Sequence, residues 1–135
     1  MNKIGKFGED IACLFLKKHG YKILERNYSK KWGELDIVAK KAKKLCFVEV
    51  KTVSCEMSEA ETGKLVTCVT VPRNDYRPEE NMHGSKIKKF TRVVQTYLQE
   101  KHAEKTEWSA ALIAIRVDIA KKVAKVRFIE DLVLQ

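Results

Sequence analysis

A chain of 135 residues with 44% hydrophobic residues is long enough to bury the core of one ordinary domain, so we expect residues 1–135 to form a single domain. Its 27 Lys and Arg residues against 18 Asp and Glu residues give a formal net charge of +9, which favours a polyanionic partner, most commonly a nucleic acid. No apolar run approaches the roughly 18 to 20 residues that span a bilayer, and Glu9 and Asp10 interrupt the apolar stretch at the N-terminus, which excludes a membrane span and a secretory signal and predicts a cytoplasmic protein.

The four cysteines are far apart and form no C-x-x-C pair. Cys13 and Cys46 fall on positions that the hydrophobic pattern assigns to the core. We expect free thiols that serve as small hydrophobic residues, and no zinc site, because no Cys and His residues cluster with ligand spacing.

The first predicted element is an amphipathic helix over residues 4–19, which Gly20 ends as a C′ residue. Its apolar face follows the spacing i, i+4, i+7, i+8, with Phe7, Ile11, Leu14 and Phe15. The segment YKILERNYS that follows is β-prone, and KKWG after it is typical of a polar turn closed by Gly33.

Residues 34–39 and 45–52 predict an antiparallel hairpin across the lysine-rich sequence KKAKK. A turn centred on Ala42 and Lys43 would place Asp36 opposite Glu49, and Glu34 opposite Lys51, all on one face. The opposite face would then be core, with Leu35, Ile37 and Ala39 against Cys46, Val48 and Val50.

Residues 53–85 are the least regular part of the chain; KLVTCVTV within them is compatible with a short extra strand, and the remainder is typical of loop. A second amphipathic helix is predicted from Lys86 to about Lys101. WSAALIAIRVDIA and KVAKVRFI predict two strands joined by a tight turn near Lys121 and Lys122. This order favours one mixed sheet with helices packed against it.

Acidic residues inside two otherwise apolar strands require a proton, a cation or an ion pair, because burying an unpaired carboxylate is costly. Mg²⁺ uses oxygen ligands and commonly takes only one or two carboxylates, which would suit Asp36 and Glu49. Lys51 could then hold a water or phosphate oxygen near the metal. The residues alone leave a second interpretation equally open, namely an ion-pair ladder on a solvated sheet face.

The motif GELDIVA followed by FVEVKT resembles the D-x(n)-E-x-K signature of the restriction-endonuclease-like (PD-(D/E)xK) nuclease superfamily. The chain also resembles the YraN-like family of small bacterial proteins from Gly5 to about Leu134, except for residues 53–74. The blocks that carry this resemblance are GEDIACLFLKKHGYKILERNY, GELDIVAK, FVEVKT, PEENMHGSKIKKFTRVVQTYL and RVDI.

The resemblance implies an α/β fold with a restriction-endonuclease-like αβββαβ core, a mixed central sheet flanked by helices. It implies that Asp36 and Glu49 bind Mg²⁺ (or Mn²⁺) and that Lys51 is the catalytic lysine. Glu9 matches an acidic position beside the metal site of archaeal Holliday-junction resolvases. An acidic residue that complements the helix dipole is the alternative for Glu9.

Basic residues flank the acidic strands, and we expect them to contact phosphates. They are Arg26, Lys30, Lys31, Lys86 and Lys89. Trp32 could stack on an exposed base or serve in packing.

The leading hypothesis is a Mg²⁺-dependent endonuclease that acts on branched or structured DNA, with a homodimer expected by analogy with junction resolvases. Two alternatives remain. One is a nucleic-acid-binding module without catalysis, and the other is a structural or interaction protein in which the acidic residues and Lys51 only form an ion-pair ladder on a solvent-exposed sheet face.

Overall fold

The computed structural model describes residues 3–57, 66–71 and 84–132. Its elements follow the predicted order, and the extra strand within residues 53–85 is present. They are α1 (Lys3–Lys18), β1 (Lys22–Lys30), β2 (Gly33–Lys41), β3 (Lys44–Ser54), β4 (Val66–Val71), α2 (Gly84–Glu100), β5 (Trp108–Asp118) and β6 (Val123–Ile129).

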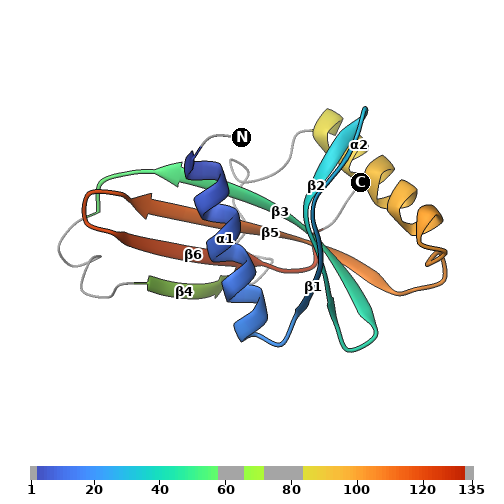
Figure 1. The fold of residues 1–135 in the computed structure, drawn as a ribbon, viewed down its shortest axis with the longest axis horizontal. Coiled ribbons are helices and arrows are strands. Elements are labelled where there is room, and N and C mark those ends of the chain that lie inside the picture. The colour runs from blue at the N-terminus through green and yellow to red at the C-terminus, as the bar shows by residue number, and fades with distance from the viewer. Residues whose placement is uncertain (1–2, 58–65, 72–83, 133–135) are drawn as a thin grey trace.

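The strands form one six-stranded sheet in the order β1-β2-β3-β5-β6-β4 (Figure 1). The β1–β2, β2–β3 and β5–β6 pairs are antiparallel, whereas the β3–β5 and β4–β6 pairs are parallel. The predicted α/β fold, with its αβββαβ order and mixed sheet, is therefore confirmed. The parallel pairing of β3 with β5 requires the long crossover that contains α2.

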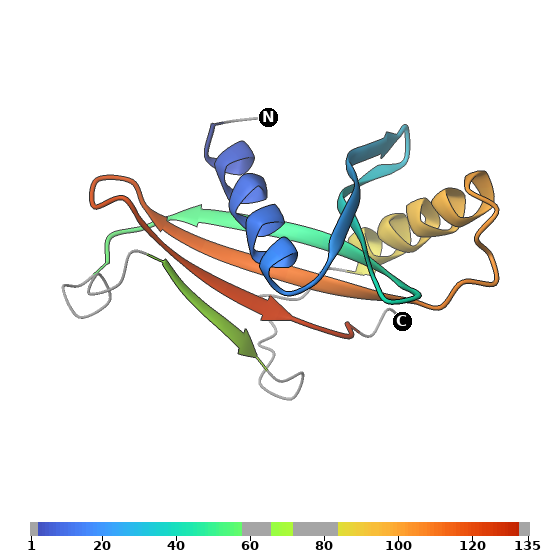
Figure 2. The same cartoon turned by 60° about the horizontal axis from the view of Figure 1, so that its bottom comes forward.

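The predicted hairpin register is confirmed for the end of β2 and the start of β3. Lys41 pairs with Lys44 around the turn at Ala42 and Lys43, and the ladder continues to the pair Ile37–Val48. There it stops, because β2 stays paired with β1 while β3 continues beside β5. Figure 2 shows the β1–β2 hairpin rising steeply away from the other strands.

This divergence corrects part of the predicted pairing. Glu34 does not lie opposite Lys51; it pairs with Ser29 of β1. Leu35 does not share the core face of Ile37 and Ala39, because it packs in the cluster on the α2 side of the sheet. Alternation along an ideal strand fails here, since β2 twists with β1 as it leaves β3.

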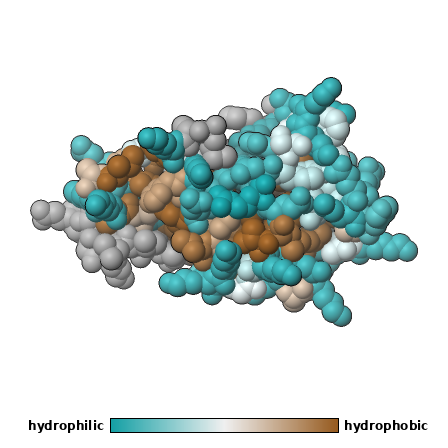
Figure 3. Space-filling model, viewed as in Figure 1, coloured by the Kyte–Doolittle hydropathy of each residue, from teal (hydrophilic) through white to brown (hydrophobic). Residues whose placement is uncertain are grey.

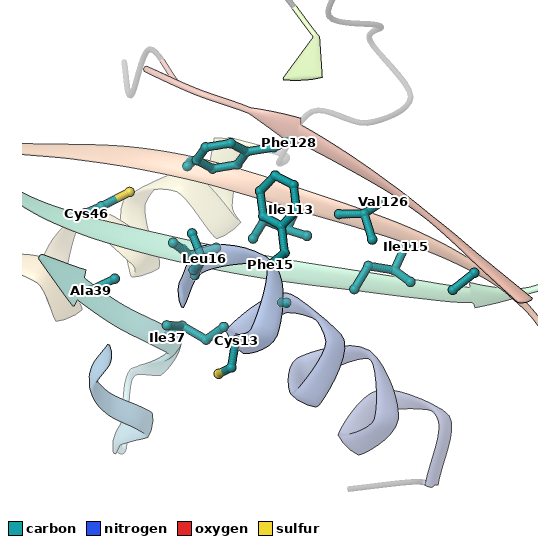
Figure 4. Close-up of a cluster of buried hydrophobic side chains, with 14 of the residues drawn as sticks. Cys13, Phe15, Leu16, Ile37, Ala39, Cys46, Ile113, Ile115, Val126 and Phe128 are labelled. Carbon is teal, nitrogen blue, oxygen red and sulfur yellow. The ribbon is translucent and has the colours of Figure 1, made fainter. Parts of the chain in front are cut away.

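The core has two main parts, one on each face of the sheet. The α1 side holds the larger cluster, in which Phe15 and Leu16 pack against strand residues such as Ile113 and Phe128 (Figure 4). On the α2 side, Phe47 contacts the rings of Tyr97 and Trp108 edge-on. Successive residues of β3 thus face opposite helices.

The prediction that the cysteines are free thiols is confirmed for the three that the structure describes. Cys13 and Cys46 are buried in the α1-side cluster and Cys55 is half-buried, all three as free thiols. The side chain of Cys68 lies outside the described part of the chain. Among the described residues, no helix is long and apolar enough to cross a membrane.

Candidate active site

Asp36 lies at the point where the sheet divides. It comes directly before Ile37, the last β2 residue paired with β3, and only 8% of its surface is exposed. Its Oδ2 accepts a hydrogen bond from the backbone N–H of Val50 at 2.7 Å. The carboxylate therefore supplies β3 with an acceptor where the β2 backbone has moved away.

The environment of Asp36 disfavours its ionised form. Burial raises the pKa of this carboxyl to about 7, and the negative charges of Glu49, Glu9 and Glu34 act in the same direction as burial, against the opposing hydrogen bond from Val50. Acidic side chains from α1, β2 and β3 thus act on one buried group. A cation at this place would remove the repulsion between them.

Glu49 lies on β3, one residue beyond the pair at which the ladder ends, and its side chain is 14% exposed. It forms an ion pair at 2.7 Å with Nζ of Lys86, from the first turn of α2. Lys51, two residues further along β3, is exposed. Within the described residues, no ion pair joins Lys51 to Glu34.

Glu9 is brought to the sheet by the close approach of α1 to β3. The approach is made at Gly8, where a Cβ atom would lie 1.8 Å from Oγ1 of Thr52. Glu9 is 6% exposed, and its Oε1 is buried without a hydrogen-bond partner among the described residues. A buried acid in the second turn does not match a residue that merely complements the helix dipole, which acts at the first turn.

The donor set fits a hard divalent cation that takes few protein ligands. In the part of the chain that the structure describes, no group of three or more His, Cys, Asp or Glu side chains is gathered closely enough to form a complete metal cage. Asp36 and Glu49 could nevertheless hold Mg²⁺, which commonly keeps most of its waters. The raised pKa of Asp36 fits a place where a cation would be stabilised. Oε1 of Glu9 makes no hydrogen bond with a described residue and has Arg26 as an ion-pair partner at 3.6 Å.

The basic residues predicted to contact phosphates fall into two groups. Three of them are held by carboxylates: Arg26 by Asp10 at 2.8 Å with Glu9 at 3.6 Å, Lys30 by Glu100 at 2.7 Å, and Lys86 by Glu49. Lys31 and Lys89, in contrast, line a pocket of about 420 Å³ between the β1–β2 turn and α2.

Two further cations of that pocket, Lys88 and Arg92, lie in the basic cluster from Lys86 to Arg92 but were not among the predicted phosphate contacts. Trp32, for which the sequence left two roles open, lines the pocket as well. Lys88 and Arg92 are four residues apart on α2, a helical spacing that could have indicated them. Trp32 packs against the α2-side cluster, and the Arg92 guanidinium covers its ring at 4.5 Å from the centroid. The packing interpretation of Trp32 is thus the one observed.

The fold and the site define an α/β protein with a mixed sheet and a buried carboxylate cluster where that sheet divides. The chain belongs to the family described as Uncharacterised protein family UPF0102, whose model matches residues 8–121. The expected membership in the YraN-like family is therefore confirmed.

Relatives include a UPF0102 protein of Campylobacter jejuni, 33% identical over 92% of this chain and 93% of its own length. A UPF0102 protein of Thermotoga maritima is 55% identical over 42% of this chain and 52% of its own length. Among solved structures, SfsA of Pyrococcus furiosus in complex with Ca²⁺ aligns with a TM-score of 0.35 and 14% identity. That alignment covers 85% of this chain, which spans 57% of the SfsA chain.

Proposed function

We propose that this protein is a Mg²⁺-dependent endonuclease that hydrolyses phosphodiester bonds in branched or structured DNA. The observation that carries the proposal is the position of Asp36, a buried carboxyl with a pKa of about 7 at the division of the sheet, facing the charges of Glu49 and Glu9. A stable fold has no need of such repulsion, whereas a cation site does.

Each residue of the site then has a defined task. Asp36 and Glu49 hold the cation, which when bound supplies positive charge against the negative charge that grows on phosphorus. Glu9 contributes its negative charge from α1, where its Oε1 makes no hydrogen bond with a described residue and lies 3.6 Å from the Arg26 guanidinium. Lys51 follows Glu49 by two residues, about 7 Å of strand, and its exposed ammonium holds the attacking water or a phosphate oxygen.

The charge of the chain supports a nucleic acid as the substrate. A net charge of +9 attracts phosphates over long range and gives the affinity that a nuclease needs before sequence or structure is read. Branched DNA and a homodimer are proposed by analogy with junction resolvases, since a four-way junction presents two symmetric cuts.

The experiment is a cleavage assay on the purified protein with four-way junction, flap, duplex and single-stranded DNA, in Mg²⁺, in Mn²⁺ and in EDTA. Metal-dependent cutting by the wild type that is lost in Glu49→Ala would support the proposal, and the preferred substrate would define the class of nuclease. Calorimetric titration with Mn²⁺ separates binding from catalysis. Unchanged Mn²⁺ binding in both Asp36→Ala and Glu49→Ala would overturn the proposal.

One observation favours a second candidate, a nucleic-acid-binding module without catalysis. The ammonium of Lys86 already neutralises Glu49 at 2.7 Å, so this carboxylate has a cation of the protein's own. In a binding module, DNA affinity would be the same in Mg²⁺ and EDTA, and no substrate would be cut.

A further inference from the structure

The β1–β2 turn and α2 line an open pocket of about 420 Å³ whose charged lining residues are all cations. Its lining consists of Lys31, Trp32, Gly33, Lys88, Lys89 and Arg92. We propose that this pocket is a phosphate-binding site that holds the backbone of a nucleic-acid strand beside the carboxylate cluster. This inference rests on the proposed function for the identity of the strand, but not for the existence of the site.

The cations of the pocket have no anionic partner within the described part of the chain. Lys31, Lys88 and Lys89 take part in none of the ion pairs found there, whereas neighbouring lysines are paired, Lys30 with Glu100 and Lys86 with Glu49. No described carboxylate neutralises these positive charges, so the pocket would attract an anion. Figure 3 shows hydrophilic residues gathered at the end of the molecule where Figure 1 places α2 and the β1–β2 hairpin.

Two contacts fix the geometry of the pocket, one between Arg92 and Trp32 and one between Gly33 and α2. The guanidinium of Arg92 lies over the Trp32 ring, with Cζ 4.5 Å from the ring centroid, which keeps its planar fork of donors oriented. Gly33, with φ of +152°, brings the turn so close to α2 that a Cβ atom there would lie 3.0 Å from Cγ2 of Val93. An oriented fork binds a phosphate oxygen pair with less loss of side-chain entropy than a free arginine does.

The position of the pocket suits a strand that passes the carboxylates. Gly33 and Asp36 are three residues apart on β2, a distance of roughly 10 Å along the strand. Lys86, which contacts Glu49, precedes Lys89 by three residues on α2, or roughly 4.5 Å of helix. The turn and the helix that line the pocket thus lead within three residues to Asp36 and to Lys86, which suits one strand that contacts both places.

The test measures binding of the full chain to a labelled single-stranded oligonucleotide in EDTA, by fluorescence anisotropy, so that cleavage plays no part. Lys88→Ala/Lys89→Ala should weaken binding by about tenfold or more, and the slope of log K against log salt should shrink by about 0.7 for each phosphate that the variant no longer neutralises. The matched control is Lys17→Ala/Lys18→Ala, which removes the same charge from the end of α1. The control should weaken binding by less than about threefold.

Two single variants test the oriented fork. Arg92→Lys keeps the charge but cannot present a planar fork, so it should weaken binding several-fold. Trp32→Phe keeps a ring beneath Arg92 and removes an indole N–H that has no hydrogen-bond partner among the described residues, so binding should persist. Thermal unfolding of every variant identifies any weakening that comes from misfolding.

The outcomes separate this inference from the proposed function. Equal weakening in the two double variants, or none in either, would overturn the pocket as a site, even if the wild type cuts DNA in Mg²⁺. Selective weakening in EDTA supports the pocket, even if no substrate is ever cut. Selective loss of binding to phosphatidylserine vesicles, with oligonucleotide binding intact, would assign the pocket to a membrane surface and overturn the proposal.

Discussion

The backbone N–H of Val50 donates a hydrogen bond to Oδ2 of Asp36 at 2.7 Å, across the point where β2 and β3 part. The bond orients the carboxylate and occupies one of its oxygens. A cation would accordingly meet the other oxygen first. The same side chain thus completes the hydrogen bonding of a central strand and faces Glu49.

Asp36→Asn should remove a pH dependence of stability. The folded state keeps a proton on this carboxyl up to a pKa of about 7, whereas an unperturbed carboxyl loses it near 3.8, so the folded chain binds more protons between these values. The free energy of unfolding should therefore fall as pH rises through this window, by roughly 4 kcal/mol at most. Urea unfolding of wild type and variant between pH 4 and 8 gives the difference in their free energies of unfolding at each pH. This difference would not change with pH if Asp36 kept an ordinary pKa.

Lys86→Gln should increase the affinity for divalent cations. The Lys86 ammonium and a cation compete for Glu49, and removing the ammonium leaves the carboxylate free. We expect Mn²⁺ binding to tighten by about three- to tenfold in calorimetric titrations. Lys105→Gln removes the same charge from an exposed turn after α2 and is the control. Equal affinities in both variants would show that Lys86 is no competitor.

Lys51→Ala should separate stability from activity. The side chain is exposed and makes no ion pair with another described residue, so the free energy of unfolding should change by less than about 0.5 kcal/mol. If the ammonium positions water or phosphate, the cleavage rate should fall by about 10² or more. Single-turnover cleavage and urea unfolding on the same preparations give both quantities. A variant that cuts at the wild-type rate would remove Lys51 from the site.

Gly8→Ala should lower the free energy of unfolding by about 1 to 3 kcal/mol, because the new methyl group would overlap Thr52. The Cβ atom would lie 1.8 Å from Oγ1 and 2.8 Å from Cβ of Thr52, so rotation of the threonine alone cannot relieve the overlap. Adding Thr52→Ala should restore part of the stability. Leu14→Ala, at an exposed position of the same helix, should change stability by less than about 0.5 kcal/mol. A Gly8→Ala variant as stable as that control would contradict the close approach.

The elements were predictable because periodicity is local. The apolar spacing of the first helix and the alternation along β2 and β3 are visible within a few residues, which is enough to predict a helix or a strand. The buried face of α1 was predicted only in part, because Phe7 and Leu14 are 50% and 65% exposed. Ala12, Cys13 and Leu16 are buried beside Phe15. The face on which Leu35 lies was not predictable, because strict alternation assumes that a strand keeps the same neighbours along its length. Before Ile37, β2 pairs with β1 but no longer with β3.

The site was predictable only in part for a similar reason. Asp36 and Glu49 were placed near each other by hairpin register, which depends on one short turn. The pairs Lys86–Glu49 and Arg26–Asp10 join residues from different elements, and only the packing of α2 on β3, and of β1 against α1, brings them together. Long-range ion pairs of this kind leave no periodic signal.

Asp118, within the RVDI block, accepts hydrogen bonds from the backbone N–H groups of Met57 and Lys121. This residue therefore has a structural role in the fold.

The parallel pairing of β3 with β5 affects the order in which the protein can fold during synthesis. Residues 45–54 of β3 pair with residues 108–117 of β5. A nascent chain that has not yet reached residue 108 therefore lacks the strand that pairs with β3 on this side. Glu9, Asp36 and Glu49 are synthesised before residues 108–117, so the strand that carries Glu49 gains this partner only after the three carboxylates have been made. We therefore expect the carboxylate site to be completed only once β5 has been synthesised.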